Sequence, residues 1–222
     1  MGRCIHDFGA VFGVKGPGLI IAAPASGCGK TIVTLALLRA YRRAGESVAS
    51  AKAGPDYIDP AFHPASSGVD CVNLGCGAMR LETLSALAGT LSDDAGLVLC
   101  EGVVGLFDGA ADGTGSTADL ALRTGWPVVL VLDVSGQAAS AAAVIRQLKP
   151  NIYVHGHDAA SHTVLASDAV SEVEAAAHAV GGHVQRTNEI QFSSSERLNS
   201  FLPVYPPHIH EYWRCLRSEE HT

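Results

Sequence analysis

The sequence contains no long hydrophobic run and no leader-like segment, and both absences exclude classes of protein. Its longest apolar runs, such as Pro127 to Leu132, are far too short to cross a bilayer. The first sixteen residues hold no continuous apolar stretch followed by a small-residue cleavage site, so no signal peptide is predicted. We therefore expect a cytoplasmic protein with no membrane partner.

Clustered basic residues and paired cysteines are also missing. The formal net charge is −7 and no stripe of Lys or Arg is present, which argues against nucleic acid as the main partner. No C-x-x-C pair occurs among the six cysteines, which lie at positions 4, 28, 71, 76, 100 and 215. Neither a zinc site nor a disulfide framework is predicted, and reduced thiols are the default expectation.

The composition of the chain changes near residue 148. Only three of the 24 glycines follow it, whereas eight of the ten histidines do. The part before it alternates strand-like runs, glycine turns and helical patterns, and the part after it shows little strand-like patterning. We therefore expect an N-terminal extension over residues 1–16, a partial domain over 17–148 and an unassigned tail over 149–222.

The last six residues, 217–222, read RSEEHT, which is one reading frame of a widely used sequencing-adapter oligonucleotide. A frameshift near residue 148 would explain both the lost pattern and the excess of histidine. We interpret the tail as out-of-frame sequence that ends in adapter, and an ordinary polar tail is the alternative. Segments of this kind are kept out of fold reasoning.

Alternating strand and helix patterns over residues 17–148 predict an α/β fold with a parallel sheet and right-handed crossovers. Strands are expected at residues 19–23, 48–52, 97–101 and 128–133. Helices are expected at residues 30–44, 81–91, 116–124 and 137–148. Gly45 stands where a glycine commonly ends a helix. In such sheets, ligands bind beyond the carboxyl ends of the strands.

A glycine-rich loop, APASGCGKT over residues 23–31, joins the first expected strand to the first expected helix. Its glycines let backbone N–H groups turn inward around phosphate oxygens, and the helix N-terminus adds positive potential. Lys30 could reach the β- and γ-phosphates of ATP, and the Thr31 hydroxyl could bind Mg²⁺. Pro24 replaces the first glycine of the strict G-x-x-x-x-G-K-T pattern.

The strand before this loop and the helix after it predict a P-loop NTPase-type parallel sheet flanked by helices. An incidental glycine-rich turn is the alternative. The residues predicted to bind the nucleotide are Ser26, Gly27, Cys28, Gly29, Lys30 and Thr31.

Carboxylates follow the second and third expected strands. Asp56 and Asp59, in the segment KAGPDYIDP, could hold Mg²⁺ or orient an attacking group, although Asp and Pro are also common in surface turns. Glu101 ends the third strand, where an acid beside the phosphate loop can hold Mg²⁺ or its water, and a strand-end cap is the alternative. Asp133 is ambiguous, and we interpret Asp119 as a first-turn helix acid.

Together, these segments resemble the cobyrinic acid a,c-diamide synthase family, within the dethiobiotin-synthetase-like branch of P-loop proteins. The segments that keep that family's order and spacing are APASGCGKT (23–31), KAGPDYIDP (52–60), EGVVGLFDG (101–109), GSTADLA (115–121) and VLDVSG (131–136). The resemblance covers residues 17 to 148, and the family has a further buried strand after this range, so the resemblance implies a sheet that is incomplete at its C-terminal side. The glutaminase domain of the family is absent. We therefore expect a fragment of such an enzyme.

The resemblance implies a glutamine-hydrolysing, ATP-dependent carboxylate–amine ligase of cobalamin biosynthesis. Such enzymes activate the a and c side-chain carboxylates of cobyrinic or hydrogenobyrinic acid as acyl phosphates, and ammonia released from glutamine then displaces phosphate. The implied partners are a corrinoid (tetrapyrrole) substrate and glutamine or ammonia, and the oligomeric state, a homodimer included, stays open. The implied cofactors are ATP and Mg²⁺.

The resemblance also implies roles for individual residues. Lys30 and Thr31 would hold ATP and its Mg²⁺, and the metal ligands would be Thr31, Asp56 and Glu101. Asp56, Asp59 and Glu101 would also place the substrate carboxylate. Lys52 would face the charge that develops on the transferred phosphate, where electrostatic stabilisation is most effective.

Three other functions share the phosphate loop. A nickel-sirohydrochlorin a,c-diamide synthase has the same motifs, whereas dethiobiotin synthetase usually differs in the GPDYIDP and GLFDG segments. A partitioning or positioning ATPase of the ParA/MinD kind would use this fold as a nucleotide-switched binding module. Those ATPases usually carry a lysine early in the loop, where this sequence has Ala25 and Ser26.

Overall fold

A computed structural model describes residues 17–134, 137, 139–156 and 164–187 of the chain. The chain divides into two compact units with a boundary between Asp133 and Val134, and each unit is described by itself. The boundary predicted from composition, residue 148, lies later in the chain and stays a prediction. The expected N-terminal extension over residues 1–16 and the suspected adapter-derived residues 217–222 lie outside the described residues.

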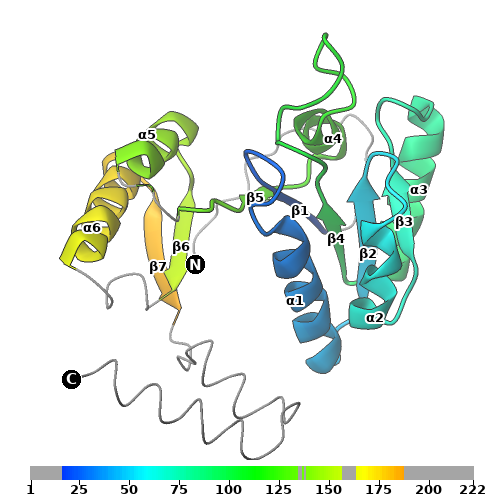
Figure 1. Ribbon diagram of the computed structural model, residues 1–222. Coiled ribbons are helices and arrows are strands. Elements are labelled where there is room, and N and C mark those ends of the chain that lie inside the picture. The colour runs from blue at the N-terminus through cyan, green and yellow to red at the C-terminus, as the bar shows by residue number, and fades with distance from the viewer. Residues whose placement is uncertain (1–16, 135–136, 138, 157–163, 188–222) are drawn as a thin grey trace, which may run out of the picture. The chain divides into compact units, whose positions relative to one another are not determined.

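The first unit is a five-stranded, fully parallel sheet flanked by helices (Figure 1). Its strand order is β3–β2–β4–β1–β5. The strands are β1 (Gly18–Ala22), β2 (Val48–Ala53), β3 (Cys71–Leu74), β4 (Leu97–Glu101) and β5 (Val128–Leu130). The helices are α1 (Lys30–Arg43), the short 3₁₀ turn η1 (Asp59–Ala61), α2 (His63–Ser67), α3 (Leu81–Asp94) and α4 (Thr117–Thr124). The predicted fold class is confirmed.

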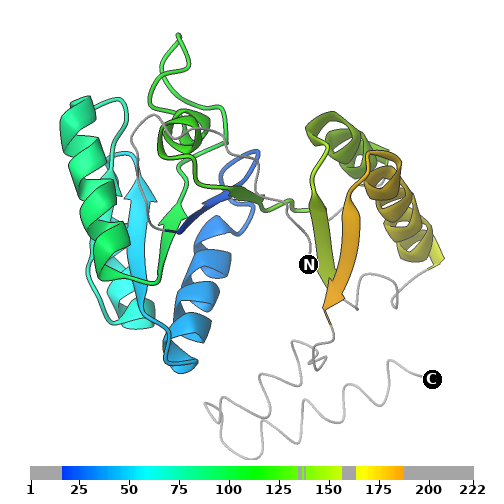
Figure 2. The same cartoon turned by 180° about the vertical axis from the view of Figure 1, so that it is seen from behind.

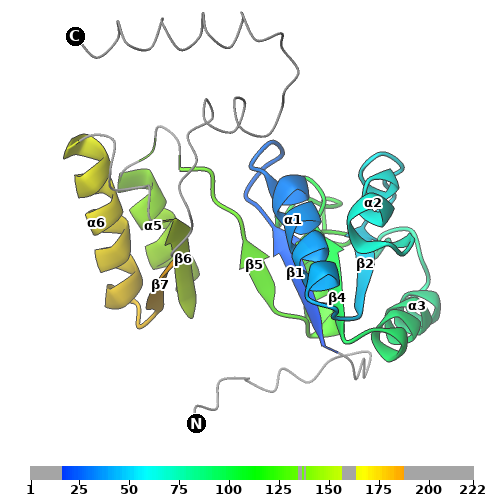
Figure 3. The same cartoon turned by 90° about the horizontal axis from the view of Figure 1, so that it is seen from below.

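Alternation along the strands divides the core of this unit between the two faces of the sheet (Figure 3). On one face, Leu38 of α1 packs against Val48 and Leu99. On the other face, α3 and α4 pack against the sheet, with Leu84 and Leu120 as their buried contacts. Since side chains alternate along a strand, Ser50 and Lys52 of β2 lie on the same face of the sheet as α1. Glu101, the last residue of β4, lies on that face as well.

The central strands lie close to the predicted ranges because most of their residues are small or apolar and buried. β4 has the predicted bounds, β1 is shifted by one residue toward the N-terminus, β2 is one residue longer, and β5 has three of the six predicted residues. The sequence analysis missed β3 and α2, which have only four and five residues and therefore show no periodicity. Gly45, at φ 80°, follows the end of α1 as predicted.

The second unit contains α5 (Ala139–Leu148), β6 (Ile152–Gly156), α6 (Val164–Ala179) and β7 (His183–Thr187), and Figure 2 shows it from behind. β6 and β7 pair in parallel. The two strands are held to α6 by Glu174, whose carboxylate lies 2.6 Å from His155 Nε2 and accepts hydrogen bonds from the Arg186 guanidinium at 2.8 and 2.9 Å.

Two strands therefore lie in the part of the chain whose sequence shows little strand-like patterning. β7 reads HVQRT and is mostly exposed, and in β6 the side chains of Ile152 and Val154 are 62% and 56% exposed. A two-stranded sheet that buries little apolar surface lacks the clear alternation by which strands are found in a sequence. Whether residues 149–222 arose out of frame stays a prediction.

Two absences predicted from the sequence concern membranes and disulfides. None of the helices in the described part of the chain has the length and apolarity needed to span a bilayer. The cysteines in that part, Cys28, Cys71, Cys76 and Cys100, are all free thiols.

Two glycines offer a matched test of these helix assignments. Gly89 lies inside α3, where an added Cβ would meet no atom within 4 Å. A glycine inside a helix is less stable than alanine, so we expect Gly89→Ala to raise the free energy of unfolding by about 0.5–1 kcal/mol. Gly68 ends α2 at φ 82°, so Gly68→Ala should lower the free energy of unfolding by roughly 1–2 kcal/mol.

Urea unfolding followed by circular dichroism measures both changes in the 222-residue chain. A shift of the two variants in the same direction would contradict the placement of α3 or of the α2 terminus.

Candidate functional site

A cavity of about 670 Å³ lies where the phosphate loop meets the segments that follow β2 and β4. These are the carboxyl ends of neighbouring parallel strands, where ligands bind in open α/β sheets. Of the residues predicted for the site, all except Cys28 line this cavity. They are Ser26, Gly27, Gly29, Lys30, Thr31, Lys52, Asp56, Asp59 and Glu101. Their chemical roles remain predictions.

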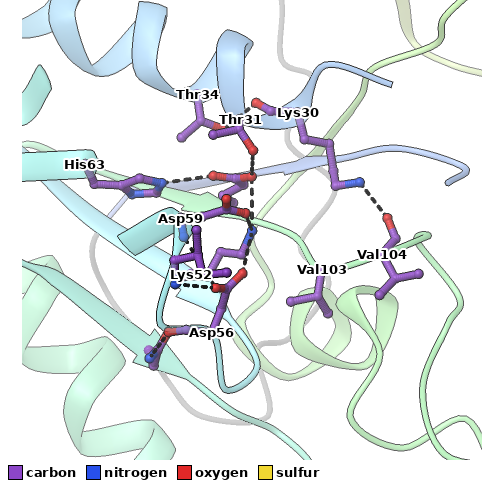
Figure 4. Close-up of polar contacts among 12 residues, drawn as sticks. Lys30, Thr31, Thr34, Lys52, Asp56, Asp59, His63, Val103 and Val104 are labelled. Atoms are coloured by element: carbon purple, nitrogen blue, oxygen red, sulfur yellow. Dashed lines mark hydrogen bonds and ion pairs between the residues drawn. The ribbon is translucent and has the colours of Figure 1, made fainter. Parts of the chain in front are cut away.

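The phosphate loop is shaped by two glycines in the left-handed region, with Gly27 at φ 82° and Gly29 at φ 88°. They let the backbone turn into α1, which begins at Lys30 and has no acidic residue in its first turn. The Lys30 ammonium donates a hydrogen bond to the carbonyl oxygen of Ala25 at 3.0 Å. It donates a second one to the carbonyl oxygen of Val104 at 2.5 Å (Figure 4). Burial, and then the nearby charge of Lys52, lower the pKa of Lys30. Phosphate oxygens could replace both carbonyl partners.

Glu101 joins the phosphate loop to the sheet. Its side chain is completely buried, and its Oε1 atom accepts hydrogen bonds from Thr31 Oγ1 at 2.5 Å and Lys52 Nζ at 3.0 Å. Burial alone would raise the pKa of Glu101. Hydrogen bonds from His63 and Thr31 and the charge of Lys52 outweigh burial and lower the pKa. Glu101 is therefore an ionised carboxylate.

Lys52 lies among three carboxylates. Its Nζ atom is 2.6 Å from Asp59 Oδ2, 3.0 Å from Glu101 Oε1 and 3.5 Å from Asp56 Oδ2, and the residue is only 2% exposed. Burial would lower the pKa of Lys52, but the hydrogen bonds and charges of Asp59 and Glu101 raise it. One ammonium thus faces three carboxyl groups, and the Lys30 ammonium is a second cation that lines the same cavity.

The loop after β2 is held in shape by Asp56. Its Oδ1 atom accepts hydrogen bonds from the backbone N–H groups of Ile58 at 2.9 Å and Asp59 at 3.3 Å. Asn73 of β3 donates a hydrogen bond to the Asp56 carbonyl oxygen at 2.8 Å. Burial would raise the pKa of Asp56, but the Ile58 N–H and the Lys52 charge outweigh it and lower the pKa. The turn thus directs the carboxyl groups of Asp56 and Asp59 toward Lys52.

The segment after β4 packs its backbone directly on the phosphate loop. Leu106 N–H donates to the Ala23 carbonyl oxygen at 2.8 Å, and a Cβ at Gly105 would lie 2.4 Å from the Pro24 carbonyl oxygen. Val104 has φ 40°, a conformation that a β-branched residue rarely adopts. This strained residue presents the carbonyl oxygen that holds Lys30, so the strain lies at the cavity wall.

His63 is a site residue that the sequence analysis missed. It is completely buried at the start of α2, with Nε2 at 2.9 Å from Glu101 Oε2 and Nδ1 at 2.5 Å from Ser50 Oγ. Burial would lower the pKa of His63, but hydrogen bonds with Cys71 and Glu101 raise it to about 9. A single histidine forms no pattern. The available signal was its position four residues after Asp59, just beyond the end of the KAGPDYIDP segment.

The remaining acids differ in their surroundings. Asp119 lies in the first turn of α4, where it receives the Gly115 N–H at 3.0 Å and the Arg123 guanidinium at 2.6 Å. Our interpretation of Asp119 as a first-turn helix acid is therefore confirmed. Asp133 does not line the cavity.

The donor set fits Mg²⁺ only together with a bound phosphate. Across the described residues, no three His, Cys, Asp or Glu side chains gather as a metal site. Mg²⁺ in nucleotide sites usually takes one or two carboxylates together with phosphate oxygens and water. Thr31 and Glu101 supply two adjacent oxygens at the cavity, and Asp56 supplies a further carboxylate beside Lys52.

Comparison with known proteins agrees with these observations. The chain matches the CobQ/CobB/MinD/ParA nucleotide binding domain family over residues 19–198, a range that continues beyond the change in composition near residue 148. It is 54% identical over 143 residues to the hydrogenobyrinate a,c-diamide synthase of Brucella anthropi, and the aligned region covers 63% of this chain and 33% of that protein.

A second relative is the hydrogenobyrinate a,c-diamide synthase of Rhizobium meliloti, at 56% identity over 128 residues, 58% of this chain and 30% of that protein. The chain thus spans about a third of the length of the curated relatives it matches. Among solved structures, the hydrogenase maturation factor HypB from Archaeoglobus fulgidus matches with a TM-score of 0.52 and 16% identity, over 78% of this chain and 81% of that chain. That similarity concerns the fold.

The close approach of Gly105 to the phosphate loop yields a steric prediction. We expect Gly105→Ala to lower the free energy of unfolding by about 1–3 kcal/mol and to weaken ATP binding, because the new Cβ would displace the segment after β4 from the Pro24 carbonyl. Urea unfolding and titration with a fluorescent ATP analogue measure the two effects. Gly89→Ala adds the same methyl group in open space and serves as the control. A Gly105→Ala chain with unchanged stability and affinity would contradict the described packing.

Proposed function

Because the chain belongs to the CobQ/CobB/MinD/ParA nucleotide binding domain family, we propose that it is the ATP-dependent amidoligase part of a hydrogenobyrinate or cobyrinate a,c-diamide synthase. The observation that carries the proposal is one cavity at which the phosphate loop meets the segments that follow β2 and β4. Lys52 lies in this cavity between Asp59 and Glu101. The 54% and 56% identity to hydrogenobyrinate a,c-diamide synthases supports the choice of substrate class.

The proposed reaction has two steps at each of the a and c carboxylates. A carboxylate oxygen attacks the γ-phosphorus of ATP, so that an acyl phosphate forms while the bond to the β-phosphate oxygen breaks and ADP leaves. Ammonia then attacks the acyl carbon, phosphate leaves, and the nitrogen loses a proton to give the amide. Glutamine is the proposed source of the ammonia.

The residues of the chain would divide this work between binding and charge stabilisation. The backbone of the phosphate loop and the Lys30 ammonium would bind the β- and γ-phosphates. Thr31, Asp56 and Glu101 would hold Mg²⁺, which when bound neutralises phosphate charge. Lys52 is a buried cation fixed by carboxylates, so it would stabilise the charge on the transferred phosphoryl group at little reorganisation cost.

Apolar side chains in the segment that follows β2 support a large organic acid as the substrate. Tyr57 and Ile58, between the two aspartates, are 87% and 73% exposed, and Phe62 is 55% exposed. Exposed aromatic side chains next to carboxylate-binding groups suit a tetrapyrrole, which combines an apolar ring system with acidic side chains.

The test uses the 222-residue chain with ATP, Mg²⁺, an ammonium salt and hydrogenobyrinic acid. We expect ADP formation that depends on the corrinoid, with conversion of carboxylates to amides detected by mass spectrometry. Nickel-sirohydrochlorin in place of the corrinoid distinguishes the nickel-tetrapyrrole alternative. ATP hydrolysis that responds to DNA or to protein concentration, and not to any carboxylate, would instead support a ParA/MinD-like ATPase and reject the proposal.

Lys30 provides a separate prediction about the nucleotide. Removing its charge-assisted hydrogen bonds, each worth about 1.5–3 kcal/mol, should weaken ATP binding roughly 10- to 100-fold in Lys30→Ala. Arg39→Ala, an exposed position on the same helix, should leave the affinity unchanged. Titration with a fluorescent ATP analogue measures both variants, and equal affinities would show that Lys30 does not contact the nucleotide.

A further inference from the structure

The two carboxylate oxygens of Glu101 have different partners. Oε1 accepts hydrogen bonds from Thr31 and Lys52, both of which line the cavity, whereas Oε2 lies 2.9 Å from Nε2 of His63, which does not. The dashed line that starts at His63 in Figure 4 marks this contact. An ionised carboxylate only accepts hydrogen bonds, so Nε2 of His63 must carry the proton in this contact.

The imidazole ring is itself fixed on both nitrogens. Its Nδ1 atom lies 2.5 Å from the hydroxyl of Ser50, which is completely buried and two residues before Lys52 on the same face of β2. The Ser67 hydroxyl donates to the His63 carbonyl oxygen at 2.9 Å, which secures the backbone of α2. The ring therefore has little freedom to leave Glu101.

One short segment couples this histidine to the acidic loop. Phe62 N–H donates to the Asp59 carbonyl oxygen at 3.0 Å, so η1 and α2 are continuous through hydrogen bonding. The segment thus delivers Asp59 to Lys52 and His63 to Glu101 at the same time.

We propose that His63 is a positioning residue for Glu101: by binding Oε2, it leaves Oε1 directed at Thr31 and the cavity. The terminal torsion of a glutamate has a broad, roughly two-fold preference, so an unanchored carboxylate could turn both oxygens toward Lys52. His63 prevents that rotation and keeps the Thr31–Glu101 oxygen pair available for the Mg²⁺ of a bound nucleotide. This inference rests on the proposed nucleotide site and is independent of the corrinoid.

The experiment separates positioning from packing with two amide variants of the 222-residue chain. In His63→Gln the side-chain amide can reach the place of Nε2 and still donate to Glu101. In His63→Asn the amide reaches only the place of Nδ1, on the Ser50 side. The probe is ADP carrying a fluorescent methylanthraniloyl group, titrated once with Mg²⁺ and once with EDTA.

We expect the gain in affinity from Mg²⁺ to be close to wild type in His63→Gln and about 10- to 100-fold smaller in His63→Asn, the usual effect of losing an outer partner of a metal ligand. Affinity in EDTA should be unchanged in both. Ser66→Ala, at a half-buried position of the same helix, is the matched control and should behave as wild type. In a Glu101→Gln background, His63→Asn should have no further effect.

Other results overturn the proposal. Equal behaviour of the Gln and Asn variants, or an equal loss of affinity in Mg²⁺ and in EDTA, would mean that His63 acts only through packing. A wild-type chain whose nucleotide affinity ignores Mg²⁺ would reject the positioning role together with the nucleotide site. Failure of corrinoid amidation alone rejects the proposed substrate and leaves these binding results unaffected.

Discussion

The buried ion pair between Lys52 and Glu101 is the contact on which the cavity depends. The two residues are direct neighbours in the register of β2 and β4, so the pair links the loops that follow these strands. Charges buried in a sheet are costly unless every one of them is matched, and here Asp59 and Asp56 match the lysine while Thr31 and His63 match the glutamate. Loss of one partner would therefore affect all three loops at once.

Backbone contacts complete the same wall. The segment after β4 lies so close to the phosphate loop that Gly105 has no room for a Cβ, and the strained Val104 directs its carbonyl oxygen to Lys30. Charge and steric fit thus act on the same few residues. Lys30 is therefore held by the carbonyl of a strained residue, Val104. The strain favours release of Lys30 from this carbonyl when a phosphate oxygen takes its place.

Much of the site could be predicted because motif residues at strand ends converge wherever a parallel sheet forms. Glu101 follows a buried apolar strand, and the glycine-rich loop follows another, so their meeting required only the fold class. The membership of the family, inferred from five segments, is confirmed by the match over residues 19–198. Cys28 shows the limit of motif reasoning, since it belongs to the loop but does not line the cavity.

By itself, the sequence determined the parallel α/β class, the central strands and the residues that gather at their ends, because apolar runs and glycine turns are local signals. Only the tertiary structure decided the role of short or polar elements: β3, α2 and the exposed strands β6 and β7 carry too few buried residues to form a pattern. His63 belongs to this second group. Its importance comes from Ser50 and Glu101, thirteen and 38 residues away in the chain, and no local pattern encodes contacts made across a sheet.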